Sequence, residues 1–274
     1  MSYNKPWKGL TLNDHFIFEL VMENAILCRR FLSLVCRRAV SPLAYPPQAE
    51  KTLLTTNYAK SSRFDIWAVD QHGNFYDIEL QKTRKKLLHL ALRNRYYKSL
   101  ADQTMLKQGH DYLKLRRFSS IFICDFDPFQ QGLRRYTFKE RCDELRTLAL
   151  PDMTEKIFLN IHGIKGEESP DMRAFLEYMA TGVVHTPFVA AFDTEVRRIK
   201  ADAKQKEKYM SLAMDYEVEM EERKAKARAE GRAEGERQRS RDIARRLLQR
   251  GLPLDLIAED TGLTVEYVQA LKQQ

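Results

Sequence analysis

The sequence predicts an α/β fold, in which helices cover a mixed β-sheet. Residues 63–81 contain two runs of β-branched and aromatic residues around a short polar break, which is the pattern of a β-hairpin. Residues 82–109 then repeat apolar side chains at helical intervals, and residues 119–126 are continuously apolar in their middle, like a buried central strand. A hairpin followed by a helix and a returning strand favours a layered α/β architecture.

The chain before the hairpin is expected to supply one helix. Asn13 or Asp14 can cap it, and its apolar residues recur at helical spacing until about Arg38. A proline-rich loop over residues 42–47 follows. Three further short runs are expected to be strands of the same sheet: residues 52–56, 134–138 and 156–161.

The hairpin places two acidic residues side by side if its loop is residues 71–73, with Gly73 in the left-handed conformation. Asp65 then faces Glu79, and directly opposite residues lie roughly 4.5–5.5 Å apart on one face of the sheet. Gln81, two residues farther along, projects the same way. A four-residue loop would break this parity, so the arrangement depends on the register of the hairpin.

Two interpretations of this acidic pair remain open. Two carboxylates this close repel each other unless a cation lies between them, and Mg²⁺ prefers one or two carboxylates together with water and phosphate oxygens. Such an ion can activate water and neutralise the transition state of phosphodiester hydrolysis. In the other interpretation, the hairpin presents a half-solvated face whose residues are polar for that reason alone.

Acidic residues of the predicted first helix are further candidates for the same site. Glu19 and Glu23 lie one helical turn apart, and either can reach the hairpin from an adjoining layer. Asp14 lies at the start of the helix. The alternative is that all three cap the helix or face solvent, since acids are favoured in first turns and on exposed faces.

A resemblance to a known family favours the metal interpretation. It depends on an ordered set of motifs: Asp14 before an apolar helix, Arg63-Phe64-Asp65-Ile66, a glycine-containing turn, Asp77-Ile78-Glu79-Leu80-Gln81, Arg95-Tyr96-Tyr97, Gly109 and Tyr112. In this order they resemble the Rpn family of recombination-promoting nucleases and putative transposases, within the PD-(D/E)XK nuclease superfamily. The resemblance runs from about Asn13 to the strand that ends at Ile161.

The resemblance implies a PD-(D/E)XK restriction-endonuclease-like core and a DNA endonuclease that promotes recombination or transposition-like transfer. Asp65 and Glu79 would bind Mg²⁺ (or Mn²⁺) and act as catalytic residues, with Gln81 placing the attacking water. The superfamily pattern commonly has a lysine where this chain has Gln81. An amide can orient a water molecule, but it adds no positive charge to the site.

A basic run that contains aromatic residues follows the hairpin. Five of its members are the expected nucleic-acid contacts: Lys82, Arg84, Lys85, Arg95 and Tyr96. Basic side chains beside aromatic rings can follow a phosphate backbone and stack on bases. Arg84, Lys85 or Arg95 can also supply the charge that Gln81 lacks. The alternative is a solvated helix face with tyrosines along its apolar boundary.

The composition is compatible with a DNA partner. The formal net charge is +8, and the isoelectric point is about 9.2, which favours polyanionic partners. The four cysteines form no C-x-x-C pair, so neither a zinc site nor a disulfide framework is indicated, and a reducing cytoplasm is expected. The sequence contains no apolar stretch of about 18 residues, which indicates no membrane partner. Nucleotide-binding loops and hydrolase nucleophile motifs are also absent from it.

The last third of the chain is expected to be helical and separate from the core. A nuclease-like domain over residues 1–190 is followed by a charged helical linker over residues 191–240, which contains Gly231 and Gly235. Apolar residues there are too sparse for a continuous coiled-coil seam. Residues 241–274 resemble a helix-turn-helix module. It either reads DNA or is a helical cap that mediates self-association or packs on a partner.

Two other functional classes stay open beside the endonuclease. One is a catalytically weak nuclease fold that binds DNA or regulates. The other is an oligomeric interaction protein, in which the charged C-terminal helix mediates self-association and the acidic residues face water.

Overall fold

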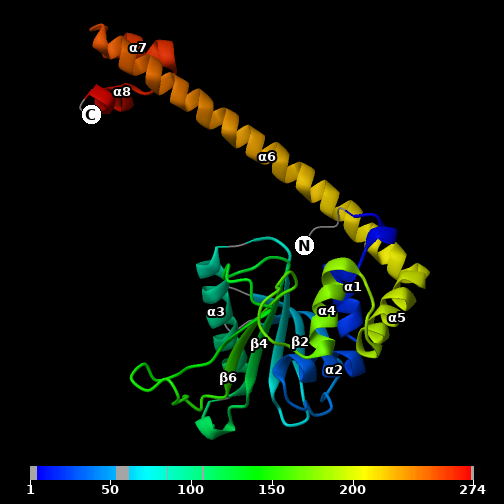
Figure 1. Ribbon diagram of the computed structural model, residues 1–274. Helices are drawn as coiled ribbons and strands as arrows, with labels where there is room; N and C mark the ends of the chain where they lie inside the picture. Colours follow the sequence, from blue (N-terminus) through cyan, green and yellow to red (C-terminus); the bar gives the residue numbers. More distant parts are fainter. Residues whose placement is uncertain (1–4, 54–61, 85, 107, 273–274) are drawn as a thin grey trace. The chain divides into compact units, whose positions relative to one another are not determined.

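The computed structural model describes residues 5–53, 62–84, 86–106 and 108–272. The chain divides into two compact units, one over Lys5–Tyr209 and one that begins at Met210. The first unit contains a sheet and its covering helices, and the second unit is helical (Figure 1).

Six strands form a mixed sheet within the described ranges, in the order β1-β2-β3-β4-β6-β5. They are β1 (Gln48–Leu53), β2 (Ser62–Val69), β3 (Phe75–Gln81), β4 (Phe118–Cys124), β5 (Arg135–Phe138) and β6 (Thr154–Asn160). β2 pairs antiparallel with β1 and β3, β4 pairs parallel with β3 and β6, and β5 pairs antiparallel with β6. Every residue of β4 is buried, as its apolar middle predicts. The predicted α/β architecture is confirmed.

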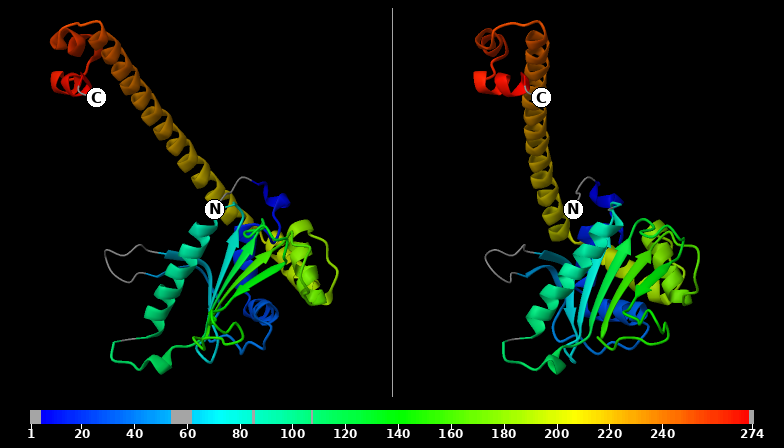
Figure 2. Two further views of the ribbon diagram at one scale, coloured as in Figure 1. Left: turned by 60° about the vertical axis from the view of Figure 1, so that its left-hand side comes forward. Right: turned by 90° about the vertical axis from the view of Figure 1, so that its left-hand side faces the viewer.

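Helices cover both faces of this sheet. They are α1 (His15–Met22), α2 (Ala25–Cys36), α3 (Leu87–Met105), α4 (Pro170–Thr181) and α5 (Pro187–Ala201), with short 3₁₀ turns η1 (Trp7–Gly9) and η2 (Tyr112–Lys114). α3 lies on one face, whereas α1, α2, α4 and α5 gather on the other (Figures 1 and 2). The ring of Tyr97 in α3 packs on that of Phe64 in β2, with centroids 4.4 Å apart. Burying such rings between layers is the main force that fixes a helix on a sheet.

The prediction of a single helix from residue 13 or 14 to residue 38 is wrong. α1 ends at Met22 and α2 begins at Ala25. The Asn24 side chain accepts hydrogen bonds from the backbone N–H groups of Ile26 (3.2 Å) and Leu27 (3.3 Å). Asparagine is a strong N-cap, so it starts a new helix within an otherwise continuous apolar pattern.

Other element boundaries shift by a few residues. α3 begins at Leu87, five residues later than expected, and β1 covers 48–53, earlier than the predicted strand over residues 52–56. Residues 54–56 of that prediction lie outside the described residues. The charged C-terminal region is also not one helix, because the chain is extended at Asp202 (ψ 114°), between α5 and α6 (Ala203–Gln249).

The second unit ends in a small module with its own core. α7 (Leu254–Thr261) and α8 (Val265–Lys272) pack against the end of α6. The buried apolar residues of this core are Ala244, Ile257, Val268 and Leu271. Gly251 and Gly262 have positive φ angles of 77° and 67°, as expected for a helix stop and a turn. Within the described ranges, no helix is both long and apolar enough to cross a membrane.

Candidate active site

The loop of the hairpin has the predicted three residues. The Asp70 N–H donates to the Asn74 carbonyl oxygen (3.0 Å), and Gly73 is left-handed, with φ 77°. The buried Asp70 carboxylate fixes the loop by accepting hydrogen bonds from the His72 N–H (2.9 Å) and the Tyr76 hydroxyl (3.0 Å). Loop length and local hydrogen bonds therefore determine the register of the hairpin.

Asp65 and Glu79 lie where the regular pairing of β2 and β3 ends. The strands pair in the predicted register as far as Ile66 and Ile78, and Asp65 and Glu79 come next. There the Asp65 N–H donates to Glu79 Oε1 (3.1 Å), and the Leu80 N–H donates to Asp65 Oδ2 (2.9 Å). Each carboxylate is therefore held by the backbone of the opposite strand.

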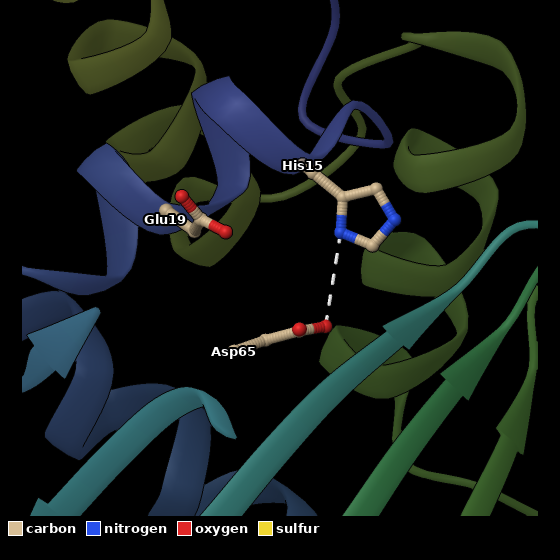
Figure 3. A group of neighbouring side chains, drawn as sticks. All are labelled: His15, Glu19 and Asp65. Atoms are coloured by element: carbon tan, nitrogen blue, oxygen red, sulfur yellow. Dashed lines mark ion pairs between the residues drawn. The ribbon is translucent and has the colours of Figure 1, made fainter. Parts of the chain in front are cut away.

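Helix α1 adds two potential metal ligands beside Asp65. His15 and Glu19 lie one turn apart on α1, and both side chains face the space above Asp65 (Figure 3). One ligand atom of each of the three residues lies within 4.8 Å of the others. His15 Nδ1 is 3.7 Å from Asp65 Oδ2, which is too long for a hydrogen bond. A cation with ligand distances of about 2.0–2.3 Å separates its ligand atoms by roughly 3–4.6 Å, so the spacing suits a shared ion.

Glu79 contacts helix α3. Its Oε2 forms an ion pair with the Arg93 guanidinium, and its side chain is fully buried. Burial raises the pKa of Glu79 well above its usual value, and repulsion by Asp65 and Asp77 adds to the rise, whereas Arg93 opposes it. Burial likewise raises the pKa of Asp77 to about 8, although the Ser120 hydroxyl donates to it (3.1 Å).

The site therefore differs from a simple pair of converging carboxylates. Asp65 and Glu79 are neighbours, as the register requires, but Asp65 contacts α1 and Glu79 contacts α3. The group of potential ligand atoms found among the described residues contains Asp65 with His15 and Glu19, and it does not include Glu79. Glu19 was only one of three candidate acids in the sequence, because nothing local distinguishes it from Glu23.

Gln81 lies at the end of β3 and is largely buried, with 7% exposure. Its amide nitrogen donates to the Leu80 carbonyl oxygen (3.3 Å). In the next strand, Cys124 is its partner in register. A role for Gln81 in placing water stays a prediction.

Arg93 is, together with His15, a site residue that the sequence interpretation missed. It was grouped with the other basic residues of the run, and Arg95 was selected instead. Helical spacing carries the missing signal: Leu90, Arg93 and Tyr97 share the face of α3 that packs on the sheet, whereas Arg95 is exposed. An arginine on an apolar helix face needs a buried anionic partner, and Glu79 provides one.

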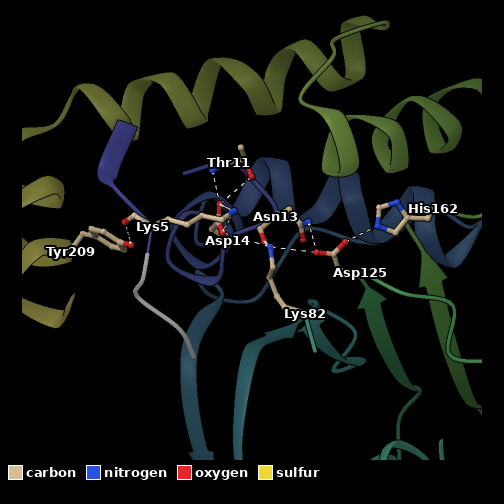
Figure 4. Close-up of polar contacts among 8 residues, drawn as sticks. All are labelled: Lys5, Thr11, Asn13, Asp14, Lys82, Asp125, His162 and Tyr209. Carbon is tan, nitrogen blue, oxygen red and sulfur yellow. Dashed lines mark hydrogen bonds and ion pairs between the residues drawn. The ribbon is translucent and has the colours of Figure 1, made fainter. Parts of the chain in front are cut away.

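The Lys82 side chain contacts other residues of the protein. Its ammonium donates to the Asn13 carbonyl oxygen (2.5 Å) and lies 3.6 Å from both the Asp14 and Asp125 carboxylates (Figure 4). Asp125 also lies 2.7 Å from His162 Nε2. These contacts tie the segment before α1 to the ends of the strands, and so help to place His15 and Glu19 over Asp65.

The other expected nucleic-acid contacts differ in exposure. Arg84 and Arg95 are exposed, and Lys85 lies outside the described residues. Tyr96 is partly buried against the cluster that contains Trp67 and Phe118. The role of these residues in binding nucleic acid stays a prediction.

The remaining acidic candidates have other positions. Asp14 Oδ2 accepts a hydrogen bond from the Thr11 N–H (2.8 Å) and from its hydroxyl (3.1 Å), so it closes the turn before α1. Glu23 lines a small polar cavity with Glu195 and Arg198, apart from Asp65.

One comparison with known proteins gives a match. A family model described as PD-(D/E)XK nuclease family transposase matches residues 40–243, about three quarters of the chain. The match includes Asp65, Glu79, Gln81 and Arg93, and it begins after α1. No curated protein and no solved structure gave a significant match.

Proposed function

Because the chain belongs to the family described as PD-(D/E)XK nuclease family transposase, we propose that it is a divalent-metal-dependent DNA endonuclease that hydrolyses phosphodiester bonds. The observation that carries the proposal is the meeting of β2, β3 and α1 at Asp65. There, Asp65, which lies beside Glu79, also faces the imidazole of His15 and the carboxylate of Glu19.

The donors around Asp65 fit a divalent cation. Carboxylate oxygens suit Mg²⁺ and Mn²⁺, and the imidazole of His15 adds affinity for a transition metal. Burial lowers the pKa of His15, which favours the neutral ring that a metal requires. Burial, together with repulsion by Asp65 and Asp77, raises the pKa of Glu79, and a nearby divalent charge would relieve this repulsion. We infer that Asp65 and Glu79 hold the metal from the sheet, and that His15 and Glu19 complete the site from α1.

The residues have separate tasks in this scheme. A bound divalent ion supplies charge for the scissile phosphate and lowers the pKa of water. The carboxylates of Asp65 and Glu79 each accept a hydrogen bond from the backbone of the opposite strand, and these bonds hold the site in place. The Gln81 amide oxygen accepts a hydrogen bond from the attacking water and orients it. Arg93 provides the positive charge that a lysine would give, from a neighbouring helix.

A plasmid-nicking assay with Mg²⁺ or Mn²⁺ tests the proposal. We expect the Asp65→Asn and Glu79→Gln variants to lose at least about 100-fold in nicking rate, since each removes a carboxylate from the site. Asp102→Asn, which removes a carboxylate on the surface of α3, should nick like the native chain. Equal nicking by all four proteins would show a contaminating nuclease and would contradict the proposal.

Binding of Mn²⁺, measured by calorimetry, separates the α1 donors from ordinary surface acids. Glu19→Gln should weaken binding about tenfold or more, because it removes a ligand. Glu23→Gln, at the C-cap of α1, removes the same charge away from Asp65 and should change little. Equal effects of the two substitutions would place the metal elsewhere.

One observation favours a second candidate, a catalytically weak nuclease fold that binds DNA. Glu79 is fully buried and paired with Arg93, which competes with a metal for the same carboxylate. If no variant and no native chain nicks the plasmid, but all bind DNA in a salt-sensitive way, this second function is correct.

The family description and the fold support a role in DNA breakage that promotes recombination or transposition-like transfer. The four free cysteines suit a reducing cytoplasm. Self-association through α6 is part of the proposal, because Met210, Met214 and Val218 form an exposed apolar row at its start.

A further inference from the structure

The middle of α6 contains no large apolar side chain that could pack in a hydrophobic core. Between residues 221 and 242, its largest apolar side chain is alanine. Residues 221–239 are all exposed. This stretch cannot form a coiled-coil seam or lie with an apolar face in a membrane surface, because both need large apolar side chains. Its charges are the only feature that can recognise a partner.

These charges are sorted by face. On a helical wheel with 100° per residue, Arg228, Arg232, Arg239 and Arg246 fall within about 40° of one another. We call these four residues the arginine stripe. All four are exposed. The acids that flank the stripe, Glu236 and Asp242, lie about 40–80° to its two sides.

Ion pairs join most of the charged residues on the opposite face of α6, with Arg237 as an exception among the described residues. Three ion pairs lie there: Arg223 with Glu219 (2.6 Å), Lys226 with Glu230 (4.0 Å) and Arg241 with Glu234 (3.6 Å). Near the start of the stripe, Glu221 is paired with Lys224 (2.7 Å). Among the described residues, no acid lies within ion-pair distance of the stripe arginines. One face therefore carries mostly paired charges. The other carries four arginines that form no ion pair with the described residues, although Glu221 attracts Arg228 at one end of the stripe.

We propose that the arginine stripe binds the phosphate backbone of duplex DNA. This inference rests on the proposed function, because it takes DNA as the substrate and assigns it a second contact surface on α6. Guanidinium groups bind phosphate oxygens in a bidentate way, and every member of the stripe is arginine. Its 18-residue span covers about 27 Å at 1.5 Å per residue, which approaches one turn of duplex DNA, about 34 Å.

The glycines of α6 favour the close approach of a partner. Gly235 lies beside the stripe on the helical wheel, and a Cβ added there would meet no atom within 4 Å. Packing within the described chain therefore does not require glycine at this position. Glycine in a helix costs about 1 kcal/mol relative to alanine, and a common compensation is close approach of another backbone.

DNA binding by two matched triple variants tests the stripe. The first, Arg228→Gln, Arg232→Gln and Arg239→Gln, removes three charges from the stripe. The second, Arg223→Gln, Lys226→Gln and Arg237→Gln, removes three charges from the opposite face of the same helix. Each lowers the net charge from +8 to +5 (8 − 3 = 5). Glutamine is a good helix former, and far-ultraviolet circular dichroism checks that α6 persists.

Affinity for a 30-base-pair duplex is measured by fluorescence anisotropy in EDTA across a range of salt concentrations. For the stripe variant, we expect about tenfold weaker binding and a slope of log affinity against log salt that is smaller by about 2–3. The opposite-face variant should bind within about threefold of the native chain. Equal losses would show a net-charge effect and overturn the proposal, and so would stripe-dependent binding of phosphatidylserine vesicles with unchanged DNA affinity.

This measurement is independent of catalysis. Binding is measured without metal, so stripe-dependent affinity in a chain that does not nick plasmid would refute the proposed function and leave the stripe intact. Nicking by a chain whose two triple variants bind DNA equally would refute the stripe and leave the proposed function intact.

Discussion

Arg93 and Glu79 show how a single residue pair holds the candidate site together. The guanidinium lies near the rings of Tyr97 and Phe122, 4.9 and 5.8 Å from their centroids, and binds the buried Glu79 carboxylate. A charge buried among aromatic rings is tolerated only when it is paired. The pair therefore anchors α3 to the strand that carries the second acid.

Removal of Arg93 should destabilise the protein through Glu79. Arg93→Met is expected to lower the free energy of unfolding by about 3 kcal/mol, because it leaves a buried carboxylate without its cation. Addition of Glu79→Gln should restore most of the loss, which urea unfolding can measure. Arg95→Met, at an exposed position two residues away, should cost less than about 0.5 kcal/mol.

The Arg93→Met effect should also depend on pH. Burial raises the pKa of Glu79 above the usual 4.5, so the folded state holds a proton that the unfolded state releases. The stability of the variant should therefore be greatest at low pH and fall as the pH rises above about 4.5. A loss of the same size at pH 5 and pH 8 would show that Glu79 is not its cause.

At the scale of elements, a helix that packs against no hydrophobic core must be stabilised by its own residues. α6 lacks large apolar residues between 221 and 242 and contains two glycines within that stretch. Its stability there depends on helix propensity and on ion pairs between neighbouring turns, which contribute only a few tenths of a kcal/mol each.

Alanine at Gly231 and Gly235 should therefore stabilise α6. Each substitution is expected to add about 1 kcal/mol of helix stability, since no atom lies within 4 Å of an added Cβ. Thermal unfolding followed by circular dichroism should show increased helix content. Gly251→Ala gives the contrast: its φ of 77° strains any other residue, so that variant should be less stable than the native chain. A lower helix content in the first two variants would contradict this account.

At the scale of the whole molecule, an exposed apolar row on α6 favours self-association. Met210, Met214 and Val218 are 48%, 67% and 61% exposed and recur every fourth residue along α6. Three such side chains cover much less area than a stable interface, which buries about 800 Å² per partner. We therefore expect weak, concentration-dependent association.

Sedimentation velocity of the full chain can locate this contact. Glutamate at the three apolar positions should abolish association, because charges replace the contacting row. Glutamate at Ala225, Ala229 and Ala233, which have the same spacing, adds the same charge outside the row and should leave association unchanged. Identical behaviour of both variants would exclude this row as the interface.

Local patterns alone determined the α/β class, the hairpin with its three-residue loop and the helical C-terminal region. These features depend on residues close in sequence: Gly73 and Asp70 set the loop, and alternation carries its register to Asp65 and Glu79. The sequence did not reveal that Asn24 divides the first helix, because its cap competes with an apolar pattern that continues past it.

Only the tertiary structure decided what surrounds the two acids. His15 and Glu19 reach Asp65 from α1, Arg93 reaches Glu79 from α3, and Lys82 is drawn into the contacts of Asp14 and Asp125. Such neighbours depend on how layers distant in sequence pack on the sheet. Apolar burial sets that packing and is not directional, so no spacing along the chain encodes which polar side chains it brings together.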